Sequence, residues 1–67
     1  AAVLERLSPR ELEVIRLFAM GYSLTEIAQS RQRSVSTIAT QKYNAMRKLL
    51  LNSNTDLIKY VYSQNML

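Results

Sequence analysis

Four polar side chains in the middle of the sequence recur at the spacing of one helix face. Intervals of four, three and four residues place side chains on the same side of a helix, and they separate Ser36, Thr40, Tyr43 and Arg47. Hydroxyl groups can hydrogen-bond to phosphates or to base edges, and a guanidinium can neutralise a phosphate or bind guanine with two hydrogen bonds. The stripe therefore has the chemistry of a nucleic-acid contact surface. The same pattern also occurs on ordinary solvated helices.

The residues beside this stripe fit the same hypothesis. Ala39 is small enough to allow close approach to DNA or to touch a thymine methyl group. Side chains at the shoulders of the stripe are suited to contacts with the DNA backbone, and they are Thr37, Lys42 and Lys48. An alternative remains for Tyr43, whose ring could equally pack against a neighbouring helix.

The distribution of charge also favours a polyanionic partner. The formal net charge is +4, and residues 27–55 contain no acidic residue. The basic residues of that stretch are Arg31, Arg33, Lys42, Arg47 and Lys48. A solvated surface usually mixes charges of both signs, so a one-sided segment indicates DNA or another polyanion. Chance clustering on a soluble surface is the alternative.

The element that must carry these side chains is a helix over residues 35–50. Ser34 can cap its first turn, and the apolar spacing that marks its buried side is formed by Val35, Ile38, Ala45 and Leu49. A short helix and a tight turn at residues 31–33 come directly before it. A short helix, a tight turn and a longer helix are typical of the helix-turn-helix motif.

Cap signals predict the other helices. The serine–acid pairs with the spacing of a cap are Ser8–Glu11, Ser23–Glu26 and Ser53–Asp56. They predict helices over residues 9–20, 24–31 and 54–64. Gly21 can end the first of them, because glycine adopts the left-handed conformation without a steric penalty. The predicted fold class is all-α: a four-helix, helix-turn-helix domain spanning residues 1–67.

Other classes of function have little support in the sequence. The chain contains no Cys and no His, and its five acidic residues are scattered, so we predict no catalytic residue, no metal ligand and no cofactor. The absence of an apolar run of about 20 residues predicts no membrane span. The rival hypothesis is a protein-interaction bundle, because the last helix offers an apolar surface formed by Tyr60, Tyr62, Met66 and Leu67.

The sequence resembles the LuxR/NarL-type (FixJ-like) effector domain of bacterial transcription regulators over most of its length. The matching blocks are residues 7–15 (LSPRELEVI), 21–23 (GYS), 25–28 (TEIA), 34–38 (SVSTI) and 44–49 (NAMRKL). Residues 36–42 (STIATQK) also resemble the response-regulator branch that controls capsule synthesis, in which Gln-Lys stands where most members have His-Arg or similar.

The resemblance implies how such a domain would work. Its second and third helices would read double-stranded DNA, and its fourth helix would support a homodimer or heterodimer on DNA. The positions implied to contact bases or phosphates are matched here by Ser36, Thr37, Ala39, Thr40, Lys42, Tyr43 and Arg47. Glu11 matches an acidic residue that pairs internally with a basic side chain, so its implied role is structural.

The resemblance also implies a longer protein. The chain would be the C-terminal output domain of a cytoplasmic regulator, most simply a two-component response regulator, with RNA polymerase as a further partner. The start at Ala1 without Met fits a domain taken from a longer chain. Two departures stand out: many members carry Lys or another polar residue at the positions of Ala39 and Tyr43. A Leu50–Leu51 step also replaces the usual glycine-plus-apolar step after the third helix.

Overall fold

The computed structural model describes residues 6–64, which form four helices and contain no strand. The helices are α1 (Pro9–Ala19), α2 (Leu24–Arg31), α3 (Val35–Lys48) and α4 (Asn54–Ser63). The predicted all-α, four-helix fold class is therefore confirmed, and so is the order of a short helix, a tight turn and a longer helix.

A serine caps the start of each helix. The caps are Ser8, Ser23, Ser34 and Ser53, and each hydroxyl oxygen accepts the backbone N–H three residues later at 3.1–3.2 Å. Two caps are reciprocal: the Glu11 and Glu26 carboxylates accept the backbone N–H of Ser8 and Ser23 at 2.9 and 2.8 Å. A helix leaves its first N–H groups without partners inside the helix, so these hydroxyls satisfy donors that would otherwise need water.

Three helices end in the same way. The residue just past each end has positive φ, and these residues are Gly21 (φ 108°), Gln32 (φ 55°) and Leu50 (φ 59°). The following N–H then donates back to the carbonyl five residues earlier: Tyr22 to Leu17 at 3.2 Å, Arg33 to Ala28 at 2.9 Å and Leu51 to Met46 at 2.9 Å. This is the Schellman pattern of helix termination.

Leu50 explains where α3 stops. The sequence predicts a helix over residues 35–50, but the regular helix ends at Lys48 with Leu49 as its cap. The left-handed conformation of Leu50 breaks the helix, although it costs about 1–2 kcal/mol for a residue with a side chain. The hydrogen bond from the Leu51 N–H to the Met46 carbonyl and the burial of Leu49 compensate for that cost.

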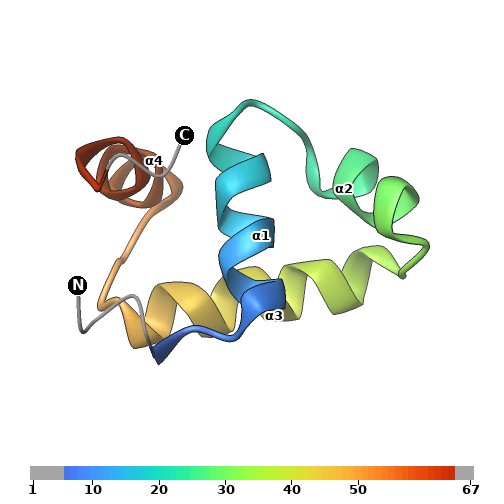
Figure 1. The fold of residues 1–67 in the computed structure, drawn as a ribbon, viewed down its shortest axis with the longest axis horizontal. Helices are drawn as coiled ribbons and strands as arrows, with labels where there is room; N and C mark the ends of the chain where they lie inside the picture. The colour runs from blue at the N-terminus through green and yellow to red at the C-terminus, as the bar shows by residue number, and fades with distance from the viewer. Residues whose placement is uncertain (1–5, 65–67) are drawn as a thin grey trace.

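The core lies on two sides of α1, which stands over α3 with α2 and α4 on opposite sides (Figure 1). One cluster joins α1 and the second half of α3 to α4; its buried residues are Leu7, Ile15, Ala19, Ala45, Met46, Leu49, Leu57 and Val61. The other joins α1 and the first half of α3 to α2; its buried residues are Val14, Ile27, Ala28 and Ile38. Phe18 packs against both clusters. Helix α1 thus fixes α3 along most of its length.

One predicted core residue lies outside these clusters. Val35 was expected on the buried side of α3 but is 44% exposed. It is the first residue of the helix, and only Ile38, one turn later, packs into the cluster with α1 and α2. Ile38, Ala45 and Leu49 are buried as predicted.

On α4, Leu57 and Val61 are buried, Tyr60 is half-buried against the core, and Tyr62 is exposed. The predicted apolar surface also included Met66 and Leu67, which lie outside the described residues. None of the described helices is long and apolar enough to cross a membrane.

Leu50 gives a test of this architecture. Replacing it with glycine should raise the free energy of unfolding by about 1 kcal/mol, because glycine adopts positive φ without the clash between Cβ and the carbonyl oxygen. Leu50 is 86% exposed, so little packing is lost. The measurement is urea unfolding followed by circular dichroism, with Leu50→Ala as the control, since alanine keeps the clash. Equal midpoints for the Gly and Ala variants would contradict the conformation assigned to Leu50.

Candidate nucleic-acid interface

Helix α3 presents a polar side to solvent along its whole length. Of the residues predicted to contact DNA, those that are exposed are Ser36, Thr37, Thr40, Tyr43, Arg47 and Lys48. Ala39 is half-buried at the edge of this side. The opposite side is held by α1 and α2 in the first half and by α1 and α4 in the second. One side of α3 is therefore packed against the other helices, and the opposite side is exposed to solvent. We call this polar side the α3 face.

Asn44 belongs to the α3 face, although it is not among the residues that the sequence predicted to contact DNA. It is exposed and lies four residues after Thr40 and three before Arg47, so the three side chains are neighbours on the helix surface. An asparagine amide can donate to and accept from one adenine at the same time. Helical spacing together with this amide chemistry is the signal that could have identified it.

The N-terminal end of the α3 face is a cluster of three hydroxyl groups. The Ser34 hydroxyl lies 2.8 Å from that of Thr37 and 3.2 Å from that of Ser36, and it also accepts the Thr37 backbone N–H at 3.1 Å. All three residues are exposed. The positive end of the helix dipole lies here. Hydroxyl donors beside free helix N–H groups suit an incoming phosphate.

Lys42 departs from the prediction. It was expected at the shoulder of the polar stripe, but the residue is only 4% exposed. Its Nζ lies 4.4 Å from the centre of the Phe18 ring and 5.4 Å from that of the Tyr43 ring. Burial lowers the pKa of the Lys42 ammonium below its ordinary value. The aliphatic stem packs between helices, and the rings provide a favourable electrostatic surface for the cation.

The contact between Lys42 and Tyr43 also bears on the tyrosine. Tyr43 is 61% exposed, so its ring is accessible on the α3 face. The Lys42 ammonium lies beside the same ring. The alternative of a ring packed away against a neighbouring helix does not describe it.

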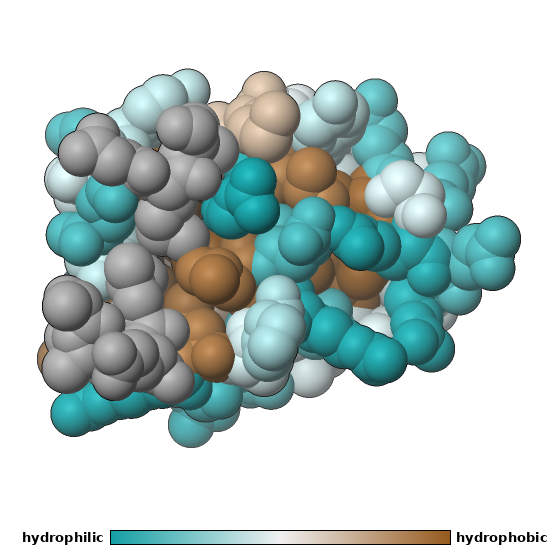
Figure 2. Space-filling view, in the orientation of Figure 1, coloured by the Kyte–Doolittle hydropathy of each residue, from teal (hydrophilic) through white to brown (hydrophobic). Residues whose placement is uncertain are grey.

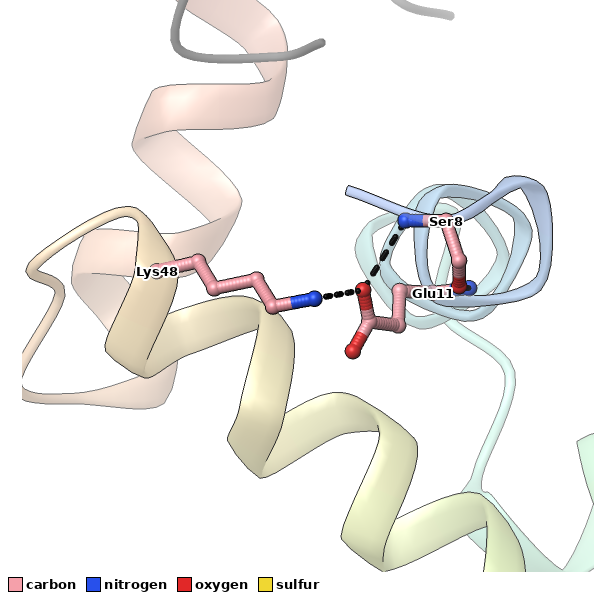
Figure 3. A network of polar contacts seen from close by, with 3 residues as sticks. All are labelled: Ser8, Glu11 and Lys48. Carbon is pink, nitrogen blue, oxygen red and sulfur yellow. Dashed lines mark hydrogen bonds and ion pairs between the residues drawn. The ribbon is translucent and has the colours of Figure 1, made fainter. Parts of the chain in front are cut away.

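Lys48 is held by an ion pair that closes α1 onto the end of α3 (Figure 3). Its Nζ donates to Oε1 of Glu11 at 2.8 Å, and the same oxygen accepts the Ser8 backbone N–H at 2.9 Å. Burial raises the pKa of the Glu11 carboxyl. The bonds from Lys48 and Ser8 and the charge of Lys48 outweigh burial and bring the pKa below 4.5. The structural role expected for Glu11 is thus visible in its contacts, and Lys48 contributes only part of its charge to the α3 face.

The end of α2 and the turn that follows it carry two arginines with different surroundings. Arg31 forms an ion pair with Glu13 of α1, whereas no ion pair of Arg33 occurs within residues 6–64. In the same part of the chain, no group of His, Cys, Asp and Glu side chains is arranged to hold a metal ion. The chemistry of this surface is hydrogen bonding and positive charge.

An anchored helix with a polar, acid-free outer side, preceded by a two-residue turn and a short helix, defines a helix-turn-helix domain. Comparison with known proteins gives the family. The family model for bacterial regulatory proteins of the luxR family matches residues 5–61. The chain therefore belongs to the LuxR family of bacterial regulatory proteins.

Individual relatives share close similarity with this chain. It is 49% identical over 59 residues to the transcriptional regulatory protein RcsB of Escherichia coli K12, covering 88% of this chain and 27% of that protein. It is 42% identical over 53 residues to the transcriptional activator protein BglJ of the same organism, covering 79% and 24%. The chain thus spans about a quarter of the length of these curated relatives.

Solved structures of RcsB have the same fold. A complex of the two-component response regulator RcsB with DNA matches with a TM-score of 0.84 and 50% identity, covering 87% of this chain and 29% of that one. A structure of two RcsB dimers bound to two parallel DNAs matches with a TM-score of 0.85 and 50% identity, covering 87% and 29%. The resemblance to the LuxR-type effector domain found in the sequence is confirmed.

The Glu11 site predicts a dependence of stability on pH. Because the pKa of Glu11 is lower in the folded chain, its ionised form stabilises the fold above about pH 4.5, and this contribution is lost as pH falls through the folded pKa. Glu11→Gln should lower the free energy of unfolding by about 1 kcal/mol at neutral pH, since charge-assisted hydrogen bonds are roughly twice as strong as neutral ones.

Urea unfolding at a series of pH values measures this effect. The difference in the free energy of unfolding between the native chain and Glu11→Gln should shrink toward zero as pH falls below 4.5. Glu26→Gln is the matched control, because Glu26 also closes a capping box but is exposed and has no ion pair among the described contacts. A difference that stays constant with pH would argue against the charge of Glu11 as its source.

Proposed function

We propose that this domain binds double-stranded DNA for transcription regulation, with α3 in the major groove. The observation that carries the proposal is the α3 face: exposed hydrogen-bonding side chains on a helix whose other side is fixed by a hydrophobic core. The major groove, about 12 Å wide, admits one helix. Residues 27–55 contain no acid that would repel phosphates.

The contacts divide between the two ends of α3. At the N-terminal end, the hydroxyls of Ser36 and Thr37 donate to a phosphate, assisted by the helix dipole. In the middle and at the C-terminal end, Thr40, Asn44 and Arg47 face base edges, where an amide suits adenine and a guanidinium suits guanine. Phosphate contacts set the position of the helix, and base contacts set its sequence preference.

The remaining members of the proposed contact set act at the edges. Ala39 permits close approach of the backbone, and Tyr43 places an exposed ring beside it. Lys42 is only 4% exposed, so it contributes positive potential from beneath the face and makes no direct contact of its own. Lys48 is exposed and adds positive charge at the edge while it remains paired with Glu11.

The relatives support a wider proposal, in which the domain is part of a longer regulator. RcsB is a two-component response regulator solved as dimers on DNA, and the chain covers 27% of it. We propose that the chain is the C-terminal output domain of such a regulator, acting on chromosomal DNA in the bacterial cytoplasm. It would bind as a homodimer or heterodimer to half-sites about 34–36 Å apart, with RNA polymerase as a further partner and no catalytic step of its own.

Arg47→Ala tests the proposed contact with DNA. The variant should bind a duplex more weakly because one cation is lost from the α3 face. For a phosphate contact, the slope of log K against log salt should fall by about one. For a guanine contact, the loss should be about 1–3 kcal/mol and depend on sequence. Fluorescence anisotropy at several salt concentrations measures both. Lys59→Ala, which removes an exposed cation from α4, is the matched control. The proposed face is wrong if Arg47→Ala leaves both affinity and slope unchanged.

Sequence preference provides a separate test. Thr40→Ala and Tyr43→Ala should change the ranking of duplexes selected from a randomised pool more than they change the affinity for a generic duplex, because neither substitution removes a positive charge. Circular dichroism should remain that of the native chain, since both side chains are exposed. The same selected sequences for both variants and the native chain would show that these positions do not read bases.

A further inference from the structure

A pocket lies between α1, the end of α2 and the middle of α3. Its volume is about 350 Å³, and the α3 side chains that line it are Ile38 and Gln41. Gln41 follows Thr40 directly, so it is turned about 100° around the helix from the α3 face. The pocket therefore opens beside the proposed DNA contact surface and not within it.

The charged lining of this pocket is unbalanced. It consists of Arg10 from α1, Arg31 and Arg33 from the end of α2 and its turn, and Glu13 from α1. Positive charges outnumber negative ones by two. Glu13 is already paired with Arg31, whereas no ion pair of Arg10 or Arg33 occurs among the residues that the structure describes. Both of these side chains are exposed, so two guanidinium groups remain available to an anionic ligand.

The pocket also has apolar walls and an amide. Val14 and Ile38 belong to its lining but are only 2% and 1% exposed, whereas Pro9 is an exposed apolar residue of the lining. Hydrophobic surface also shows between hydrophilic side chains in the region between α1 and α2 (Figure 2). The half-buried Gln41 adds a hydrogen-bond donor and acceptor at its side. A matching ligand would bear carboxylates next to apolar groups. Acidic polypeptide segments have this combination.

Glu13 argues against a DNA strand as the occupant. A duplex carries one negative charge per about 1.7 Å along its axis, so a strand laid across the pocket could not avoid this carboxylate. A peptide can place single carboxylates beside the arginines and a neutral group beside Glu13. The recessed shape also favours side chains that project from a peptide over the convex backbone of a duplex.

We propose that this pocket docks an acidic, partly apolar segment of a partner protein. Carboxylates of that segment pair with Arg10 and Arg33 and compete with Glu13 for Arg31, while an apolar side chain packs against the exposed ring of Pro9. Docking at this site is separate from the α3 face, so the domain can hold DNA and the partner segment together.

The probe is a fluorescent peptide of Glu-Glu-Leu repeats, with a Gln-Gln-Leu peptide of equal length as the uncharged control. Binding is first measured without DNA, so that the result does not depend on the proposed DNA contact. Arg10→Ala and Arg33→Ala should each weaken binding of the acidic peptide about two- to fivefold, the range expected for exposed ion pairs. Arg16→Ala is the matched control, because Arg16 is an exposed arginine of α1 outside the pocket.

Glu13→Gln gives a test in the opposite direction. It removes the carboxylate that occupies Arg31, so it should strengthen binding of the acidic peptide about two- to fivefold. Both partners of this ion pair are more than 40% exposed, so folding should be little affected. In a nitrogen-labelled chain, the peptide should shift the backbone signals of Arg10, Glu13 and Gln41 in the native form and after saturation with a duplex.

Three results would overturn the proposal. The first is equal binding of the acidic and uncharged peptides. The second is an equal loss of peptide affinity for Arg16→Ala and for the pocket variants, which would indicate general attraction of the acidic peptide to a basic protein. The third is displacement of the peptide by a duplex together with weaker duplex binding by Arg10→Ala and Arg33→Ala. That last result would assign the pocket arginines to DNA phosphates and leave the DNA-binding proposal standing.

Discussion

Helix α1 is apolar on two sides, and both sides have to be covered by other helices. Ile15 and Ala19 require α4 and the second half of α3, while Val14 requires α2 and the first half of α3. A domain of this size has little surface to bury, so no other element can replace α1 as the centre. The positions of α2 and α4 on opposite sides of it follow from this requirement (Figure 1).

The same requirement sets the direction of α3. Ile38 near its beginning and Leu49 at its end belong to different clusters, and α1 contributes to both. The ion pair between Glu11 and Lys48 fixes the C-terminal end, and the two-residue turn at Gln32 and Arg33 fixes the other. The exposed side of α3 is therefore presented at one angle, which is what contact with a rigid duplex requires.

Features fixed by neighbouring residues could be predicted from the sequence, and those that depend on distant packing could not. The caps at Ser8 and Ser34 depend on groups three residues away, so their types and spacing were sufficient. Val35 has the spacing of a core residue, but only the assembled structure shows that the core ends before it. The spacing of Lys42 from Ile38 and Ala45 also placed it on the inner side. Its charge argued for the shoulder, and the rings of Phe18 and Tyr43 that accommodate the ammonium could not be located from the sequence.

Separation of the two sides of α3 has an evolutionary consequence. Thr40, Asn44 and Arg47 are exposed and take no part in the buried clusters, and surface substitutions of this kind usually change stability by less than about 0.5 kcal/mol. After a gene duplication, these positions can diverge almost freely while the buried frame stays constant. The same buried core can thereby support many regulators with different targets, and each of them keeps a stable fold.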